Sequence, residues 1–366
     1  MGFFNEFNRD DLLAYTDEGP LYFSDVLLTS PQKDSIECIH YAKNKSSLLA
    51  IYSALYYSKS FFVIDASWSR SFTNSYLELI KHNTINESIF FIPTSGSTGQ
   101  PKLVCHLVTS LFKSSQRSLH HHLLSSNSFS ILSLSPSTMG GLLTITKALL
   151  SRSTLVVSSS HWSSQLQNYS NLNLSIVPQQ LSKILSFPSV NPDIFQFILV
   201  GGDRVSDDVK KKASHLPIVY SYGSTESCGQ VIATKLGESI DDYYCLNDVN
   251  IRFDHNELLL KTPTLAYGFL TLNGFHSLPL SDSFYLTNDI VTQLPKFNVI
   301  GRKDFQFQSG SKLISPEFIE QEFKRFGFNN SMIVIPKKHD VYGFVPVMFL
   351  KSLENVAQLH VFSQQH

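Results

Sequence analysis

Short apolar runs of strand type alternate along the chain with stretches whose apolar residues recur at helical spacing. Residues 48–66 begin with helical spacing and end in FFVID, which predicts a helix followed by a strand. SIFFIP, SFSILSLSP and STLVVSSS predict three further strands. NLSIVPQQLSKILSF and FQFILVGGDRVSDDVKKKASHL each predict strand, turn and helix, with Ser206 or Asp207 as N-cap of the second helix. This alternation predicts a mostly parallel sheet covered by helices.

The pattern changes after about residue 240, where VNIRF, ELLLKT, SFYLT and NVIGR predict an antiparallel sheet or small barrel. SPEFIEQEFKRFG then predicts a helix and SMIVIP a strand. We therefore expect the α/β fold class, in a chain with several domains that together have α+β character. Its large N-terminal domain covers residues 1–301, with sheet layers to about 240 and a β subdomain over about 241–301. A small, mobile C-terminal α+β domain covers 302–366.

Composition excludes several classes of protein. The 366 residues include 29 basic and 30 acidic side chains, so nothing in the net charge of −1 attracts nucleic acid. No apolar run approaches the length of a membrane helix, and MGFFNEFNRDD lacks the pattern of a secretory signal. The four cysteines form no C-x-x-C pair. We expect reduced thiols in a cytoplasmic protein.

A loop of small and hydroxylated residues follows the strand SIFFIP. It contains Thr94, Ser95, Gly96, Ser97, Thr98 and Gly99. The glycines let backbone N–H groups approach an anion, the hydroxyls add donors, and Lys102 adds a positive charge. Such a loop suits a polyphosphate, although it lacks the GK[ST] of a Walker loop. A flexible surface loop is the alternative, which the position after a strand and the closing Pro-Lys disfavour.

Four segments resemble motifs of the adenylate-forming superfamily, in that family's order. TSGSTGQPK resembles its phosphate loop, and YSYGSTE resembles its Tyr-Gly-x-Thr-Glu motif. FYLTNDI resembles Tyr-x-Thr-Gly-Asp, with Asn288 in place of glycine. GRKDFQFQSGSKLISPEFIE resembles the hinge and the start of the C-terminal domain. The resemblance spans roughly residues 88–350 and implies the superfamily's fold.

The resemblance also assigns roles near the adenine and the phosphates. It implies that Tyr222 stacks on adenine, that Gly223 allows a close approach, and that Thr225 contacts the phosphate undergoing transfer. Glu226 would hold Mg²⁺, a cation that prefers carboxylate and phosphate oxygens. Gly201 and Gly202 would form a turn along the adenine, and a plain strand-to-helix turn is the equal alternative.

Further roles fall in the C-terminal part of the chain. By resemblance, Asp289 and Arg302 would bind the ribose, and Asp304 would be the hinge at which the C-terminal domain turns between half-reactions. Gly310 would lie beside the path of pantetheine.

The implied reaction has two half-reactions. A carboxylate attacks the α-phosphate of ATP to give acyl-AMP and pyrophosphate, with Lys102, Thr225 and Glu226 as the catalytic residues. A thiol, usually that of coenzyme A, then takes the acyl group and releases AMP. The expected partners are therefore a small carboxylic acid, ATP with Mg²⁺, and coenzyme A, and we expect a homodimer.

The acid is suggested by a closer resemblance. The chain has about 90 residues before the phosphate loop, as in the short 2-succinylbenzoate–CoA ligases of menaquinone biosynthesis. SIVPQQLSKIL and ILVGGDRVS are similar to segments of that subfamily. STMGGLLTITKALL lies where its members line the acid pocket, but Ser137 and Thr138 replace the usual aromatic or histidine neighbours.

Two alternatives remain open. We find no counterpart of the family's C-terminal lysine motif, since Lys337 and Lys338 fall earlier, in an expected strand-end turn, as solvated charges. Either the sequence is truncated, or the chain is a nucleotide-binding scaffold with weakened catalysis. The other alternative is another acid–thiol ligase or a stand-alone adenylating protein that loads a carrier protein.

The histidine run 120–122 is a poor metal site, because neighbouring helical residues point to different faces.

Overall fold

The computed structural model describes residues 4–30, 36–81, 87–95, 101–122, 128–159, 161–187, 190–325 and 332–350. The chain divides into two compact units. The first comprises residues 1–251 and 260–285, and the second comprises 252–259 and 286–366.

A nine-stranded sheet in the first unit has the order β13–β12–β11–β10–β9–β7–β8–β1–β2. In that order, the strands are Tyr243–Cys245, Gly229–Thr234, Ile218–Ser224, Phe195–Val200, Leu172–Ile176, Phe129–Ile131, Thr154–Val156, Leu12–Thr16 and Gly19–Tyr22. The pairs from β11 through to β1 are parallel, and the pairs at both ends are antiparallel. The carboxyl ends of β7, β9, β10 and β11 therefore meet at one edge.

A six-stranded sheet in the same unit has the order β17–β16–β6–β5–β4–β3. In that order, the strands are Gly274–Ser277, Gly268–Thr271, Pro101–Leu107, Ile89–Ser95, Phe61–Asp65 and Glu37–Tyr41. β3, β4 and β5 are parallel, whereas β6, β16 and β17 run antiparallel to their neighbours. β6 directly follows the expected phosphate loop, and the sequence pattern did not predict it as a separate strand.

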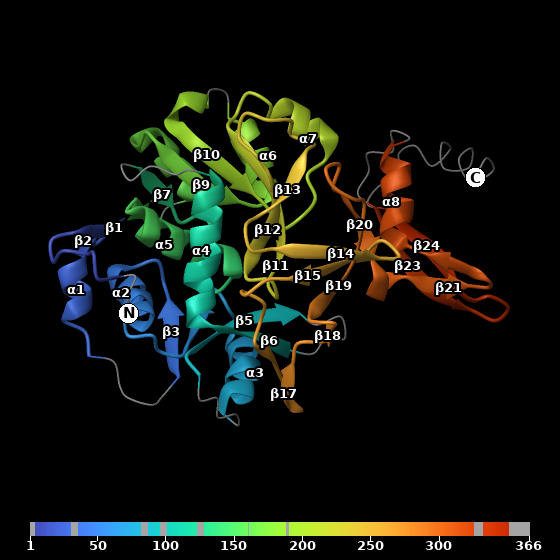
Figure 1. The fold of residues 1–366 in the computed structure, drawn as a ribbon, viewed down its shortest axis with the longest axis horizontal. Helices are drawn as coiled ribbons and strands as arrows, with labels where there is room; N and C mark the ends of the chain where they lie inside the picture. The colour runs from blue at the N-terminus through green and yellow to red at the C-terminus, as the bar shows by residue number, and fades with distance from the viewer. Residues whose placement is uncertain are drawn as a thin grey trace. The chain divides into compact units, whose positions relative to one another are not determined.

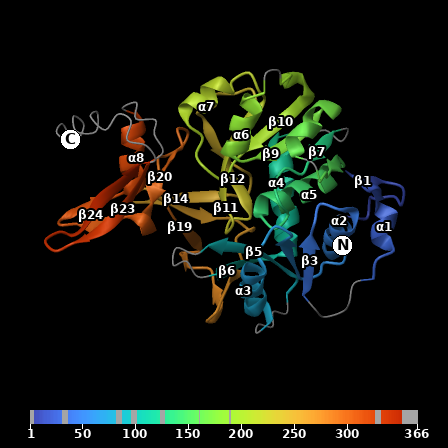
Figure 2. The same cartoon turned by 180° about the vertical axis from the view of Figure 1, so that it is seen from behind.

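Two helices form a layer between these sheets, as Figure 1 and Figure 2 show. α4 (Val108–His122) packs on β6 of one sheet and β12 of the other, and α5 (Met139–Ser151) packs on β7, β8 and β9. Their apolar side chains join a central buried cluster with Phe61 and Phe90. α1 (Phe23–Leu27) and α2 (Lys45–Tyr56) pack beside β2 and β3 and contribute to the same cluster.

Other helices cover the outer faces of the two sheets. α6 (Pro178–Leu185) and α7 (Asp207–Lys212) share a buried cluster with β9 and β10. α3 (Arg70–Lys81) shares another with β4, β5 and β6. Short 3₁₀ segments cover Trp162–Asn168 and Pro192–Ile194. Ser206 caps α7 by accepting the Val209 N–H, so the predicted helix start is confirmed, as is the mostly parallel covered sheet.

The strands predicted after residue 240 form one sheet with antiparallel pairs. β14 (Asn250–Asp254), β15 (Glu257–Lys261), β19 (Phe284–Val291) and β18 (Leu280–Ser281) follow in this order, and β20 (Val299–Arg302) pairs with β19. β14, β15 and β19 pass from one unit to the other.

The second unit continues with a small α+β arrangement. A four-stranded antiparallel sheet has the order β22–β21–β24–β23, made of Lys312–Ile314, Phe307–Ser309, Gly343–Leu350 and Met332–His339. α8 (Pro316–Arg325) packs on β23 and β20. Lys337 and Lys338 are exposed, as predicted, but lie within β23 rather than in a turn. The division into two compact units does not test where the chain turns, so the domain border expected between residues 301 and 302 stays a prediction.

From the composition we expect reduced cysteines and no membrane helix. All four cysteines are free. Among the described residues, no helix is both long enough and apolar enough to cross a membrane.

Candidate active site

The strands on either side of the expected phosphate loop form a hairpin, β5 with β6. Thr94 pairs with Lys102 and Ser95 with Pro101, and Thr94 Oγ1 donates to Lys102 O at 3.5 Å. The remaining loop residues fall outside the described ranges. They are Gly96, Ser97, Thr98 and Gly99. Strand pairing therefore fixes where the loop begins and ends, and phosphate binding by the loop stays a prediction.

Lys102 faces both a carboxylate and an aromatic ring. Its Nζ lies 3.6 Å from Glu226 Oε1 and 3.9 Å from the centre of the Phe269 ring. Phe269 pairs with Val104, two residues beyond Lys102 on the same face of β6. The Lys102 and Glu226 side chains are only 26% and 17% exposed, so their attraction is less screened than at an open surface. A cation and a carboxylate from two separate motifs thus meet at one point.

Thr225 and Glu226 lie in the turn that joins β11 to β12. A Cβ on Gly223 would lie 2.0 Å from Gly229 O, so the two strands approach more closely than any other residue allows. Tyr222, just before this point, pairs with Ile232. The close approach seen at Gly223 is that of the partner strand, and the approach of adenine there stays a prediction.

The glycine turn after β10 lies against the start of the same motif. β10 and β11 pair in parallel up to Val200 and Tyr220, which brings the residues after both strands to one edge. A Cβ on Gly201 would lie 2.6 Å from Ser221 Oγ, and Gly202 has φ +87°. Glycine therefore suits the positive φ at residue 202, and at residue 201 a larger residue would require Ser221 to move. Gly201, Gly202 and Tyr222 therefore share one edge, where the predicted adenine site would lie.

His106 supports the turn from behind, and the sequence analysis missed it. It is fully buried on β6, and its ring stacks on Phe90 with centroids 5.2 Å apart. Burial lowers the pKa of His106 to about 4, although the hydrogen bond to Thr225 raises it. The ring is therefore neutral at pH 7, and Nε2–H donates to Thr225 O at 2.7 Å. A lone histidine within an apolar strand was the only available signal.

Lys147 is a buried cation on α5, in the segment that resembles the acid-pocket lining. Burial lowers the pKa of Lys147 to about 8, so most molecules carry the charge at pH 7. Its Nζ donates to Ser175 Oγ at 3.0 Å. No carboxylate among the described residues pairs with it. An ammonium has three donors and is costly to bury without an anion.

In the second unit, the two predicted ribose residues are cross-strand partners. Asp289 on β19 pairs with Arg302 on β20, and Arg302 Nη1 lies 3.3 Å from Asp289 Oδ1. Arg302 also donates to both oxygens of Asp304, at 2.8 and 2.9 Å. Asp304 lies in a short 3₁₀ turn, Lys303–Phe305. The structure thus joins the predicted ribose residues to the predicted hinge residue.

A buried carboxylate beside this pair was not predicted from the sequence. Glu257 is 1% exposed and forms a 2.6 Å ion pair with Lys303. Its other oxygen accepts the Asn288 N–H at 3.2 Å. Asn288 itself has φ +60°, a region that asparagine enters more readily than other non-glycine residues. The replacement of the family's glycine by Asn288 is therefore compatible with the backbone.

Gly310 lies in the turn between β21 and β22, with φ +60°. Its N–H donates to Tyr342 O at 2.8 Å. A contact with pantetheine at this glycine stays a prediction.

A cavity of about 440 Å³ opens at the carboxyl ends of β3, β4, β7 and β8. Polar groups in its wall bond to one another: Asp65 accepts from Ser67 N at 2.9 Å and from Ser135 Oγ. These hydrogen bonds lower the pKa of Asp65 despite the opposing effect of burial. The carboxylate of Asp65 in the cavity wall is therefore already hydrogen-bonded within the protein.

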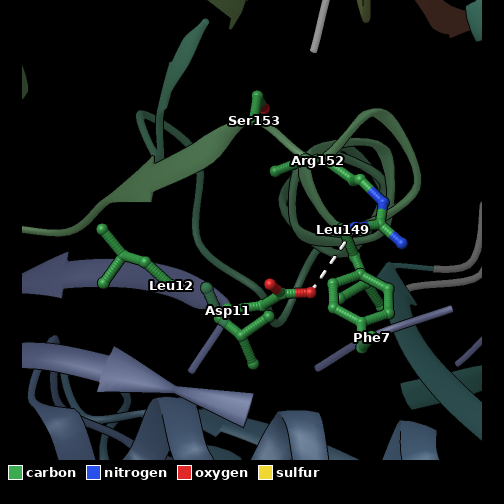
Figure 3. Close-up of a pocket in the computed structure, with 8 residues that line it drawn as sticks. Phe7, Asp11, Leu12, Leu149, Arg152 and Ser153 are labelled. Atoms are coloured by element: carbon green, nitrogen blue, oxygen red, sulfur yellow. Dashed lines mark hydrogen bonds and ion pairs between the residues drawn. The ribbon is translucent and has the colours of Figure 1, made fainter. Parts of the chain in front are cut away.

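A smaller depression of about 180 Å³ lies beside the end of α5, and Figure 3 shows its lining. Arg152 extends over the Phe7 ring at 4.9 Å and reaches Asp11 at 3.5 Å. The charge of Arg152 is thus paired within the protein, and the depression lies between packed segments of the chain.

Comparison with solved structures establishes the class of fold. Wild-type MenE from E. coli, bound to an analogue of OSB-AMS, has a TM-score of 0.79 at 18% identity, covering 97% of this chain and 89% of that chain. MenE from Bacillus subtilis with ATP and magnesium ion has a TM-score of 0.79 at 15% identity, covering 100% and 92%. ATP-bound MatB from Rhodopseudomonas palustris has 0.82 at 13%, covering 100% and 91%.

The chain belongs to the AMP-binding enzyme family, which matches residues 27–250. A 2-succinylbenzoate–CoA ligase of Haemophilus influenzae is 28% identical over 268 residues, 69% of this chain and 57% of that protein. One of Staphylococcus epidermidis is 27% identical over 209 residues, 53% of this chain and 44% of that protein. The chain thus spans about half the length of the curated relatives it matches.

Proposed function

We propose that this chain uses ATP to activate a carboxylic acid as an acyl-AMP and then transfers the acyl group to coenzyme A. The acid we propose is 2-succinylbenzoate. The observation that carries the proposal is the meeting of Lys102 and Glu226 at 3.6 Å. The two residues come from separate motifs, and both have charges that a nucleotide phosphate and its metal require.

Lys102 would act on the phosphates. In the first half-reaction, an oxygen of the acid attacks the α-phosphorus, and the bond from that phosphorus to the pyrophosphate oxygen breaks. Negative charge grows on the phosphate oxygens, and a fixed ammonium stabilises it. Phe269 and Glu226 hold the Lys102 ammonium in place before the nucleotide arrives. The hydroxyl of Thr225 would donate to the same phosphate.

Glu226 fits the proposed Mg²⁺ in its donor chemistry. Among the described residues, no group of three or more acidic, histidine or cysteine side chains could enclose a metal. Mg²⁺ commonly binds one or two carboxylates together with substrate phosphates and water, which one carboxylate at Glu226 matches. When bound, the ion would neutralise charge on the phosphates.

Lys147 supports an acid with two carboxylates. 2-Succinylbenzoate keeps one carboxylate when the other is activated. The buried ammonium of Lys147 would pair with the one that remains, which offsets the cost of burying both charges. The names of the relatives from Haemophilus influenzae and Staphylococcus epidermidis support the same acid.

The second unit would bind the ribose and take part in thiol transfer. Asp289 would accept the ribose hydroxyls while Arg302 fixes its orientation. The thiol sulfur then attacks the acyl carbon, and AMP leaves with the electrons of the broken bond. Asp304 as hinge and Gly310 beside pantetheine belong to this proposal. The four free cysteines support a cytoplasmic location.

The test measures pyrophosphate release from ATP, Mg²⁺ and 2-succinylbenzoate, with mass spectrometry for the coenzyme A thioester. We expect both products, and Lys102→Ala should lower the rate of release by at least about a hundredfold. A matched control is Lys113→Ala, which removes an exposed charge of α4. Acyl transfer to a carrier protein but not to coenzyme A would favour the adenylating alternative. ATP binding without pyrophosphate release would favour the scaffold, and no ATP binding would reject the proposal.

A further inference from the structure

Hydrogen bonds from distant parts of the first unit hold the backbone of the β11–β12 turn. His106 Nε2 donates to Thr225 O at 2.7 Å, and Ala266 N donates to Glu226 O at 2.7 Å. Glu226 thus has its backbone fixed from β6 on one side and from residue 266 on the other. Its carboxylate points to Lys102.

The carbonyls that follow are joined through one buried guanidinium. Thr264 Oγ1 donates to Ser227 O at 3.0 Å, and Ser114 Oγ donates to Cys228 O at 2.5 Å. Arg117 donates to both of these hydroxyls, at 3.1 and 3.4 Å. It also donates directly to Gln230 O at 3.0 Å. Arg117 therefore bonds directly to one of these three carbonyls, and it is linked to the other two through hydroxyl groups.

The chemistry of arginine sets the direction of these bonds. A guanidinium only donates, and Arg117 Nη1 shares its hydrogens among Asp248, Thr262 and Thr264, at 2.9, 2.7 and 3.1 Å. Because the Thr264 hydroxyl accepts from Arg117, its own hydrogen is left for Ser227 O. The Arg117 side chain is 1% exposed and pairs with Asp248 at 2.9 Å. A buried charge with this set of partners is costly to rearrange, which makes the arrangement rigid.

We propose that Arg117 is a positioning residue, which holds the β11–β12 turn in the conformation that presents Glu226 beside Lys102. It acts through backbone carbonyls and two hydroxyls. Its consequence for Mg²⁺ rests on the proposed function, whereas its effect on the turn does not.

The first experiment compares Arg117→Lys with Arg152→Lys by hydrogen exchange on the full chain. Lysine keeps the charge but loses the planar fork that serves several acceptors at once. Arg152 lies in the same unit, with its side chain 40% exposed. In Arg117→Lys we expect exchange to rise about tenfold in the β11–β12 turn and to stay unchanged in α2. Unchanged exchange in the turn, or an equal rise in α2, would overturn the proposal.

The second experiment titrates Mg²⁺ into the chain with ATP. Loss of a side chain that orients a metal ligand weakens metal affinity about tenfold or more, and we expect this for Arg117→Lys. In a Glu226→Gln background the same substitution should have no further effect, because both changes act on one interaction. Additive losses would mean a general structural role and would overturn the proposal.

A milder variant guards against misfolding of Arg117→Lys. Thr264→Val removes the donor to Ser227 O and one acceptor of Arg117 but keeps the guanidinium, and we expect a smaller increase in hydrogen exchange of the turn. If the unaltered chain binds no Mg²⁺ and ATP, the proposed function fails, and the exchange comparison still decides whether Arg117 positions the turn.

Discussion

One buried ammonium would set the preference among acids. Replacing Lys147 with methionine keeps the length of the side chain and removes its charge. We expect the KM for 2-succinylbenzoate to rise about tenfold or more, the value of a charge-assisted hydrogen bond. For 4-oxo-4-phenylbutyrate, which lacks the ring carboxylate, the KM should change little. Steady-state kinetics with both acids measures the difference.

The matched control is Lys113→Met, which changes an exposed lysine on α4 and should alter neither KM. Equal losses of Lys147→Met for both acids would show that Lys147 serves packing and not the second carboxylate.

The burial of a second residue, His106, predicts that the free energy of unfolding depends on pH. Its pKa is lowered from 6.5 to about 4 in the folded chain. The unfolded chain therefore binds the proton first as pH falls below about 6.5, and folding stability is lost down to about pH 4. Between pH 7 and pH 5, this one group should lower the free energy of unfolding by on the order of 1–2 kcal/mol.

Urea denaturation of His106→Gln at both pH values is the measurement. Glutamine keeps a donor for Thr225 O but does not titrate, so the loss of stability between pH 7 and pH 5 should shrink. His122, whose pKa burial lowers to about 3, will retain part of the loss. A variant whose stability falls as steeply as that of the unaltered chain would contradict this role for His106.

At the scale of elements, the β11–β12 hairpin depends on a glycine for its geometry. Gly223→Ala would place a Cβ 2.0 Å from Gly229 O, and both backbones would have to move. We expect a loss of about 1–3 kcal/mol in the free energy of unfolding. Gly140→Ala is the control, because its Cβ would meet only the end of the Leu134 side chain. Equal thermal midpoints for the two variants would show that the hairpin tolerates the added atom.

The same elements show what the sequence can and cannot predict. FFVID and FQFILV were recognised as strands because apolar runs of strand length bounded by turns are a local signal. The glycines of TSGSTG lie outside the described residues, and Gly223 of YGSTE lies within β11 rather than in the turn that follows. Arg117 gave no such signal, because its partners lie far away in the sequence, on β12 and at residues 248 and 264. Its importance arises only when those segments meet in the folded chain.

At the scale of the whole molecule, the proposed reaction requires the C-terminal domain expected over residues 302–366 to turn about Asp304. Proline at this position fixes φ and removes the backbone N–H. We expect Asp304→Pro to retain pyrophosphate release and to lose most thioester formation. Asp304→Asn, which keeps backbone freedom, should retain both. The two products measured separately decide the matter, and loss of both in Asp304→Pro would mean general damage.

The homodimer expected from the sequence also belongs to this scale. It stays a prediction, and light scattering on the purified chain tests it directly.

The strand pairing of Thr94 with Lys102 has a kinetic consequence. Because Lys102 belongs to β6, strand pairing and the contact with Phe269 hold its charge in place. Capture of the anionic nucleotide should then depend on this fixed charge, so its association rate should fall with added salt. Changes between positions 96 and 100 should act instead on how long the nucleotide stays bound. Entry and residence would thus be controlled by different parts of one hairpin.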